Sequence, residues 1–314
     1  MQMGMALFNI LIFPGFLFLC VMGLVFEYVD RIIYARLQNR QGPPFFQPLA
    51  DFIKLAAKEE IIPDAADKKL FKFMPILAMT AAVTALFYIP LWGYNSLYPF
   101  PGDIIVVLYI LTIPTITFFL GGWSSTSLFS MIGAVRTLTQ LFSYEVLLFL
   151  AVLSPALLAN TWSLSEMTVF YSDKPYMMLF NLIAFFISIV ALLGKLEKVP
   201  FDISEAETEI VGGTFTEYTG KLLAMFRLAI DIEMVVGASL IAAVFLPFGL
   251  GLSPMFSFAL YILKVLFIVF LLSAGRTIFA RLRIDQMVSV CWKYFAPLAF
   301  AQVLIILIIK GVLL

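Results

Sequence analysis

Acidic residues are concentrated in one stretch of this sequence, KLEKVPFDISEAETEIVGGTFTEY (residues 195–218), which lies between two strongly apolar regions and holds six of the twenty acidic residues. Carboxylates about 7 Å apart repel each other by roughly 2 kcal/mol at an effective dielectric constant near 20, and such groups tend to share and exchange protons. The candidates in this acidic segment are Asp202, Glu205, Glu207, Glu209 and Glu217. The segment is therefore predicted to handle protons; the alternative is a solvated loop whose carboxylates balance nearby basic loops.

Charges inside apolar stretches form a second group of candidates. Each costs about 2.5 to 3.5 kcal/mol at the centre of a membrane-spanning helix unless it is paired or hydrated. Glu145 is the first candidate for proton handling here, because Arg136 and Gln140 precede it and would form a polar strip along the same helix. The alternative is that this helix begins later, which would leave Arg136 in a loop and Glu145 satisfied by a neighbour.

Three further proton-path candidates, Asp231, Glu233 and Lys264, lie in later apolar stretches. Arg227 is one helical turn from Asp231, so these two can neutralise each other as a structural ion pair, whereas Glu233 faces another direction and needs a different partner. Lys264 can pair with Glu233 or Glu145; alternatively, it is a lone lysine that snorkels or is held neutral.

The composition indicates which elements must position these residues. Hydrophobic residues make up 62% of the 314-residue chain, charged residues only 13%, and the mean hydropathy is +1.03, values typical of a polytopic membrane protein. At about 20 residues per span, eight helices and their loops use nearly the whole chain. Residues 1–314 are therefore predicted to form a single transmembrane domain in contact with membrane lipid, with no separate soluble domain and no nucleic-acid partner.

The sequence argues against a metal or redox centre held by this chain alone. It contains no histidine and only two cysteines, Cys20 and Cys291, which are far apart. Zinc, haem and Fe–S sites need several ligands of these types at suitable spacing. We therefore expect no metal and no cofactor on this chain, and we expect any linked redox chemistry to reside on a partner or on a bound small molecule.

The predicted fold is all-α, with about eight transmembrane helices. Apolar runs that mark them include residues 1–26, 175–194, 220–246, 253–274 and 294–309, and the fourth helix begins near Phe129 if it includes Arg136 and Glu145. Basic residues gather after the first, third, fifth and seventh helices. The positive-inside rule then places four loops of a multi-pass cell-membrane protein in the cytoplasm, approximately residues 31–72, 122–132, 195–219 and 275–293, and both termini outside.

Two of these cytoplasmic loops are predicted to contain helices. In QPLADFIKLAAKEEII, residues Leu49, Phe52 and Ile53 share one face opposite charged residues, a pattern typical of an amphipathic helix on the membrane surface. In the acidic segment, Asp202 and Ser204 each precede a glutamate by three residues, which indicates a capped short helix before the glycines at 212–213.

Four motifs give the sequence a family resemblance. They are ARLQNRQGPPFFQPLADFIKLAAKEEIIP (residues 35–63), GAVRTLTQLFSYEV (133–146), PFDISEAETEIVGGTFTEYTG (200–220) and RTIFARLRIDQM (276–287), the last followed by Trp292 and Lys293. With these motifs in this order, the chain resembles the membrane subunit at the quinone end of respiratory complex I and its counterpart in membrane-bound (group 4) nickel-iron hydrogenases. The resemblance covers nearly the whole chain.

The resemblance implies a non-redox membrane subunit that docks hydrophilic Fe–S and hydrogenase-like large subunits and couples their electron transfer to ion movement through antiporter-like membrane subunits. It implies Fe–S clusters and a nickel-iron centre on those partner subunits. By the same resemblance, the acidic segment is a docking and cavity loop and Glu145 is the family's membrane glutamate. The residues that would face the soluble module are Arg36, Arg40, Arg276, Arg281, Arg283 and Asp285.

Two departures from the family pattern indicate a branch. The quinone-using branch has a longer loop where this chain has only RQGPPFFQP, and it usually carries a glutamate at the position of Lys195. We therefore predict a subunit of a ferredoxin-linked, hydrogenase-type complex that moves protons or sodium ions. The equivalent subunit of a polysulfide or sulfane reductase, or of a quinone-reducing complex, is the alternative.

Two readings outside this family role stay open. Intramembrane charges and the prolines Pro114 and Pro155 inside spans also fit a stand-alone secondary ion transporter, although no inverted repeat is visible in the sequence. A purely structural anchor, in which the charges only pair with one another, is the other.

Overall fold

The computed structural model describes residues 2–313, and the side chains of residues 4–206 and 209–312. Within this part the protein is all-α, without strands, and eight helical segments are long and apolar enough to cross a membrane. They are Gly4–Leu37, Lys68–Leu86, Asp103–Ser124, Leu128–Ala159, Pro175–Lys195, Gly220–Phe245, Pro254–Ile278 and Ile284–Val312. The predicted fold class and the predicted number of spans are confirmed.

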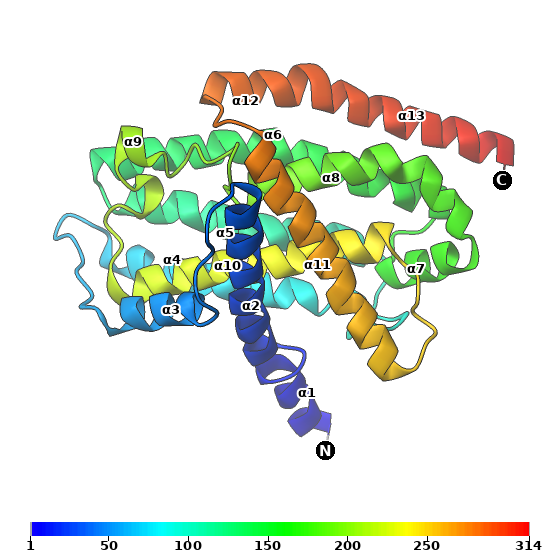
Figure 1. The fold of residues 1–314 in the computed structure, drawn as a ribbon, viewed down its shortest axis with the longest axis horizontal. Helices are drawn as coiled ribbons and strands as arrows, with labels where there is room; N and C mark the ends of the chain where they lie inside the picture. The colour runs from blue at the N-terminus through cyan, green and yellow to red at the C-terminus, as the bar shows by residue number, and fades with distance from the viewer. Residues whose placement is uncertain (1, 314) are drawn as a thin grey trace.

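The core is built around α10 (Gly220–Phe245), which runs through the middle of the molecule and contacts α4 (Lys68–Leu86) and α8 (Leu182–Lys195) (Figure 1). Its most apolar stretch is 89% buried, as expected of a helix that is hydrophobic on all sides. Beside it, α5 (Asp103–Ser124) packs between α4 and α6 (Leu128–Ala159), and α6 also packs against α8. The charged residues of α10 are therefore held inside the bundle.

Two inclined helices, α2 (Phe16–Leu37) and α11 (Pro254–Ile278), cross this bundle and contact each other (Figure 1). A shorter α1 (Gln2–Leu11) precedes α2. The sequence places the first span at residues 1–26 and the seventh at 253–274, but both helices continue further. Arg36 and Arg276 consequently lie on helices, and not in the loops predicted at residues 31–72 and 275–293.

The predicted loop at residues 195–219 corresponds to the segment that separates α8 from α10, but two other boundaries differ from the expected ones. The fourth span, α6, begins at Leu128, close to the predicted Phe129, so only residues 125–127 separate it from α5. The last span begins at 284 instead of 294, because α12 (Ile284–Val290), η3 (Cys291–Phe295) and α13 (Ala296–Leu313) follow one another without a break. Helical backbone satisfies its own hydrogen bonds, so a span can run past the apolar stretch that marks it in the sequence.

The predicted amphipathic helix is present as α3 (Gln47–Ala57). Its apolar residues Leu49 and Ile53 are exposed, whereas Asp51 turns toward α2, where it accepts a hydrogen bond from Arg31. Leu49 and Ile53 thus point away from the protein, as required of a helix that meets lipid on one side, whereas Phe52 from the same predicted face packs against the core.

The acidic segment forms only two short turns, α9 (Glu207–Ile210) and η2 (Gly213–Phe215). The predicted short helix before the glycines is present as α9, but its predicted side-chain cap is wrong, because the residue at the N-cap is Ala206, which has no polar side chain. The segment is held against α6 by close backbone contact: a Cβ on Gly133 would lie 2.5 Å from the backbone nitrogen of Thr214. Gly213 itself has a φ of +54°, and a Cβ there would lie 1.7 Å from the Ser204 carbonyl oxygen. These glycines fix where the acidic segment lies.

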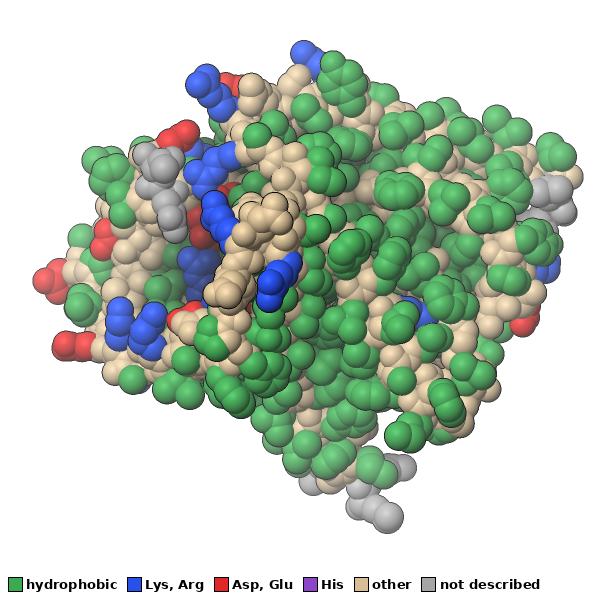
Figure 2. Space-filling model, viewed as in Figure 1, with side chains coloured by type: hydrophobic (Ala, Val, Ile, Leu, Met, Phe, Trp, Pro, Cys, Tyr) green, Lys and Arg blue, Asp and Glu red, His purple; other side chains and the backbone are tan. Residues whose placement is uncertain are grey.

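Charged side chains gather at one end of the molecule, over α3 and α9, and the rest of the visible face is mostly hydrophobic (Figure 2). The opposite end carries α7 (Leu164–Asp173) and η1 (Pro175–Asn181), which connect α6 to α8 (Figure 1). Exposed aromatic and aliphatic side chains along the spans, such as Phe142, Phe186 and Leu263, fit a lipid-facing surface.

Candidate proton-transfer site

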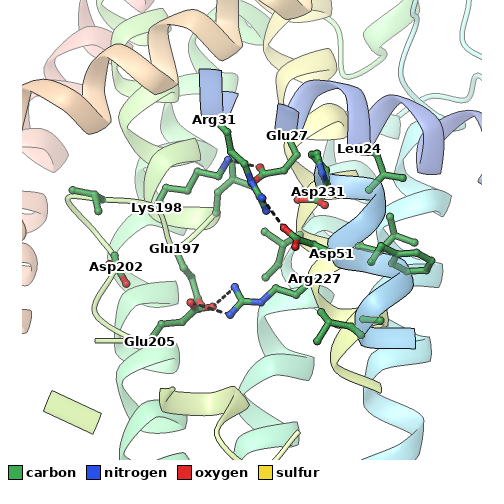
Figure 3. A pocket seen from close by; sticks show the side chains of 18 of the residues that line it. Leu24, Glu27, Arg31, Asp51, Glu197, Lys198, Asp202, Glu205, Arg227 and Asp231 are labelled. Atoms are coloured by element: carbon green, nitrogen blue, oxygen red, sulfur yellow. Dashed lines mark hydrogen bonds and ion pairs between the residues drawn. The ribbon is translucent and has the colours of Figure 1, made fainter. Parts of the chain in front are cut away.

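A cavity of about 520 Å³ opens at the charged end, among α2, α3, α10, α11 and the start of the acidic segment (Figure 3). Twelve of its 21 lining residues are charged, which suits water and ions and not an apolar ligand. The charged lining residues are Glu27, Arg31, Asp51, Lys54, Glu197, Lys198, Asp202, Glu205, Arg227, Asp231, Arg276 and Arg281.

Ion pairs hold the elements around this cavity together. Arg31 on α2 donates to Glu27 at 2.8 Å and to Asp51 of α3 at 2.9 Å (Figure 3). Arg227 on α10 donates to both carboxylate oxygens of Glu205, at 2.9 and 3.3 Å. Such two-point contacts between arginine and a carboxylate fix geometry as well as charge. The acidic segment is thereby tied to the central helix.

The pairing of Arg227 with Glu205 corrects one expectation from the sequence. Arg227 and Asp231 were predicted to form the ion pair on this helix, but the guanidinium of Arg227 reaches Glu205 of the acidic segment instead. Asp231 faces the cavity, where it interacts electrostatically with Glu27, Lys198 and Arg31 as well as Arg227. The spacing along one helix could not reveal a partner from another element.

Asp30 is the fully buried centre of an ion-pair network beside the cavity. Its carboxylate accepts hydrogen bonds from Ser273 at 2.6 Å, from Lys198 at 2.6 Å and from Arg276. Burial alone would lower the pKa of Lys198, but the charges of Asp30 and Glu27 outweigh it and raise that pKa. A buried carboxylate with this many charged donors is fully paired. The network joins α2, α11 and the turn after α8.

Glu197 lies on the inner wall of the cavity, on the turn that follows α8, and its side chain is almost completely buried. Neither carboxylate oxygen has a hydrogen bond of good geometry within the described structure. Burial raises the pKa of Glu197 to about 8; the nearby carboxylates of Glu205 and Glu233 add to this effect, and the hydroxyls of Ser204 and Thr137 oppose it. The group can therefore gain or lose a proton near neutral pH.

Behind Glu197, Lys195 and Glu233 form an ion pair at 3.1 Å with both side chains fully buried. The ammonium of Lys195, at the end of α8, also donates to the carbonyl oxygen of Leu111 on α5 and lies 5.6 Å from the ring centre of Tyr144. This pair links three spans at the centre of the bundle. Lys195 is thus the partner that Glu233 was expected to need and that the sequence did not identify.

Glu145 on α6 faces this pair and interacts electrostatically with both Lys195 and Glu233. Its side chain is buried, and neither of its oxygens has a hydrogen-bond partner among the described residues. The predicted polar strip on α6 exists only in part, since Gln140 donates to the Gly194 carbonyl at 2.7 Å and does not reach Glu145. The alternative of a later helix start is wrong, because Arg136 lies within α6.

These groups form a series of electrostatically coupled sites from the open cavity to the middle of the bundle. Glu205 interacts with Glu197, Glu197 with Glu233, and Glu233 with Lys195 and Glu145. Each step joins ionisable groups whose charges influence one another, so a change in charge at the cavity alters the proton affinity of the next group. The arrangement can store protons and can couple their binding at the charged end to the charge of groups in the membrane-spanning interior.

Comparison with known proteins agrees with this architecture. The family described as NADH dehydrogenase matches residues 8–307. The chain belongs to this family. An NADH-quinone oxidoreductase subunit of Carboxydothermus hydrogenoformans is 34% identical over 93% of this chain and 85% of its own length, and NADH-quinone oxidoreductase subunit 8 of Thermus thermophilus is 32% identical over 88% and 80%.

A solved structure of a membrane-bound sulfane sulfur reductase, an archaeal respiratory membrane complex, contains a chain that superposes with a TM-score of 0.83 at 27% identity. The match covers 92% of this chain and 96% of the other. These relatives are subunits of multisubunit respiratory complexes in membranes. The chain is accordingly a membrane subunit of the complex I type.

The predicted proton-path residues lie in several different parts of the structure. Asp202, Glu205 and Asp231 line the large cavity, and Glu145 and Glu233 lie in the buried cluster. Glu217 is half-buried and lines neither this cavity nor the smaller one described next. The side chain of Glu207 lies outside the described part of the chain.

A smaller cavity of about 170 Å³ adjoins the first and takes up other predicted residues. Glu209 lies there and accepts a hydrogen bond from Arg136 at 2.7 Å, with Arg283 and Asp285 on the same walls. Arg281, which lines both cavities, binds Asp202. Of the predicted docking residues, Arg276 and Arg281 thus have partners within the chain, while Arg36, Arg40, Arg283 and Asp285 are exposed.

Lys264 takes neither of the two partners considered for it. Its ammonium donates to the carbonyl oxygen of Phe248 at 2.6 Å and lies 4.5 Å from the ring centre of the same residue. Glu233 is paired with Lys195 instead. The pairing of Lys264 with an intramembrane glutamate was therefore wrong, and the alternative of a lone buried lysine is the one that the fold realises.

Several functional residues were missed by reasoning from the sequence. Glu197 and Lys198 belong to the KLEK run whose first lysine, Lys195, was noted only for its departure from the family pattern. Glu27 and Asp30 follow the first uncharged run and resemble ordinary charges at a helix end. The available signal was their spacing of three residues, which places both on one face of a helix.

Proposed function

We propose that this chain is the non-redox membrane subunit of a membrane-bound, hydrogenase-type respiratory complex. In this role it anchors a hydrophilic Fe–S and hydrogenase-like large-subunit module and couples electron transfer there to the translocation of protons or sodium ions, together with antiporter-like membrane subunits. The Fe–S clusters and the nickel-iron centre belong to the partner subunits, and this chain carries no cofactor of its own.

The observation that carries this proposal is the line of interacting groups from Glu205 through Glu197 to Glu233 and Glu145. Moving one charge against 100 mV requires about 2.3 kcal/mol. Two unit charges about 7 Å apart at an effective dielectric near 20 interact by roughly 2 kcal/mol. One change of charge at the cavity can therefore supply an energy comparable to that needed to move one ion across the membrane. A redox event in a docked module can thus be converted into a change of protonation inside the bundle.

In the proposed orientation the charged end faces the cytoplasm of the cell, and both termini lie outside. The excess of basic residues in the loops at this end supports it. Arg36, Arg40, Arg283 and Asp285 are exposed there and are the residues proposed to contact the soluble module. The cavity mouth would then open toward that module.

The polar lining of the cavity supports a branch that does not use quinone, because a quinone ring and tail would lie against twelve charged side chains. A second candidate is the equivalent subunit of a sulfane sulfur reductase, favoured by the full-length structural similarity to a chain of that complex. The purified native complex should be assayed for hydrogen evolution, polysulfide reduction and quinone reduction. Hydrogen evolution is expected; quinone reduction alone would contradict the proposal.

The coupling role is tested by Glu145→Gln in the assembled complex, reconstituted in liposomes. Loss of ion translocation per electron transferred is expected, with turnover in leaky vesicles retained, because glutamine cannot take up and release the proton. Glu166→Gln is the matched control: Glu166 lies on α7 at the opposite end and binds Thr161. Unchanged coupling in Glu145→Gln would remove this residue from the path.

A stand-alone transporter makes a different prediction. The purified chain, placed alone in liposomes with an imposed ion gradient, is expected to show no ion flux above that of empty vesicles. Flux through the isolated chain would favour the transporter, since no redox partner would be present to drive it.

A further inference from the structure

The buried cluster contains a place built like a cation site. The carbonyl oxygen of Leu111 on α5 points at it and accepts the hydrogen bond that is made there. The carboxylate of Glu233 reaches the same place from α10, and Glu145 faces it from α6. Carbonyl and carboxylate oxygens are the ligands that hard cations such as sodium take in proteins.

In this chain the ammonium group of a lysine side chain occupies the site. The ammonium of Lys195 donates to Leu111 and lies 3.1 Å from Glu233, and its side chain is 0% exposed. The flank of the site is closed by the ring of Tyr144, whose hydroxyl is occupied by Thr115 at 2.8 Å. A metal ion could reach these oxygens only at the point where the ammonium already lies, and the positive charge there would repel it.

We propose that the ion exchanged at this cluster is the proton, and that Lys195 determines this selectivity by occupying the position of a metal cation. This inference rests on the proposed coupling function and names its ion, which the sequence left open between proton and sodium. It makes Lys195 a selectivity-determining residue and not a passive partner of Glu233.

The charges around the cluster support exchange of a proton. Lys195 and Glu233 cancel each other, which leaves the carboxylate of Glu145 as the uncompensated group facing them, with Glu197 on the side of the cavity. Neither oxygen of Glu145 has a hydrogen-bond partner among the described residues, so a bound proton neutralises it without further ligands. A sodium ion needs several oxygen ligands, and the nearest available oxygens, those of Leu111 and Glu233, are already bound to the ammonium of Lys195.

The test is equilibrium binding of radioactive sodium to the detergent-purified whole complex, at alkaline pH where carboxyl groups are deprotonated. Partner subunits contribute the same background to every variant. Wild type and Glu233→Gln are expected to bind equal amounts. Lys195→Gln, which removes the charge but keeps a donor for Leu111, is expected to bind one additional sodium ion per complex, and this gain is expected to vanish in the double variant Lys195→Gln with Glu233→Gln.

Lys264→Gln is the control, because it removes another buried lysine whose ammonium binds a backbone carbonyl and not a carboxylate. One sodium ion more in wild type than in Glu233→Gln would overturn the proposal, as would the absence of any gain in Lys195→Gln. If Lys195→Gln fails to assemble, the comparison of wild type with Glu233→Gln still decides whether the native cluster binds sodium. Binding stoichiometry does not depend on turnover, so this result is separate from the outcome for Glu145→Gln.

Discussion

Two buried carboxylates, Asp30 and Glu145, lie in the same bundle but in opposite surroundings. Asp30 accepts hydrogen bonds from Lys198, Ser273 and Arg276, and none of its surface is exposed. Glu145 is buried nearly as well, yet its oxygens have no hydrogen-bond partner among the described residues. Asp30 is therefore a charged residue that links helices through ion pairs, whereas Glu145 is a group whose charge can change.

The difference teaches where stability and function separate in this chain. Removing one partner of a buried, hydrogen-bonded charge network leaves the other charges uncompensated. Removing a buried carboxylate that has no partner leaves nothing unsatisfied and can even relieve a desolvation cost. The difference between Asp30 and Glu145 can therefore be tested by substitutions that keep the shape of the side chain and remove only its charge.

The largest effect is expected for Asp30→Asn. Arg276 would lose its carboxylate partner and Lys198 would keep only Glu27, at 3.3 Å; breaking a buried network of this kind costs about 3–5 kcal/mol. Thermal unfolding in detergent, followed by circular dichroism, should show a clearly lowered midpoint. Glu145→Gln, of the same chemical type, should leave the midpoint unchanged or raise it. Equal destabilisation by both substitutions would mean that the two sites do not differ as described.

An intermediate effect is expected from the pH dependence of Glu197. Its pKa rises from 4.5 to about 8 on folding, so between these values the folded state holds a proton that the unfolded state has lost. Its favourable contribution is complete below pH 4.5 and is lost as the pH rises through about 8, with a slope of about 1.4 kcal/mol per pH unit in between.

Glu197→Gln should flatten this part of the stability curve. The measurement is the unfolding midpoint of wild type and variant across the pH range, with both expected to agree under acidic conditions and the variant more stable in alkaline buffer. A variant whose curve runs parallel to that of wild type would show that Glu197 does not bind the proton.

The smallest effect is expected at the cavity mouth. Asp51 on α3 pairs with Arg31 at 2.9 Å, but the two side chains are 30% and 38% exposed. Partly hydrated pairs of this kind contribute about 0.2–1 kcal/mol, less at high salt. Asp51→Asn should lower the unfolding midpoint only slightly, and the difference from wild type should shrink as salt is added. A loss comparable to that of Asp30→Asn would show that the mouth is as tightly paired as the interior.

Several elements of this architecture could be predicted from the sequence. The eight spans, the start of α6 near Phe129 and the amphipathic α3 follow from apolar length and periodicity, which depend only on neighbouring residues. Glu145 and Glu233 could be singled out because charge in an apolar run is costly wherever the helix lies. The ends of α2 and α11 could not, since their last turns carry ordinary charged residues.

The partners of the charged residues could not be predicted either. Arg227 lies one turn from Asp231 but binds Glu205, and Lys264 binds a backbone carbonyl while Lys195 takes Glu233. Each of these contacts joins elements that are brought together only by packing.

The sequence alone determined that this chain is a helical membrane protein of a known family, because uncharged stretches long enough to span lipid must satisfy their backbone hydrogen bonds as helices. Only the tertiary structure decided which carboxylates are neutralised and which are left to exchange protons. The physical reason is distance: a charge is governed by its neighbours within a few ångströms, and for Asp30 and Glu145 those neighbours come from other helices, far away along the chain.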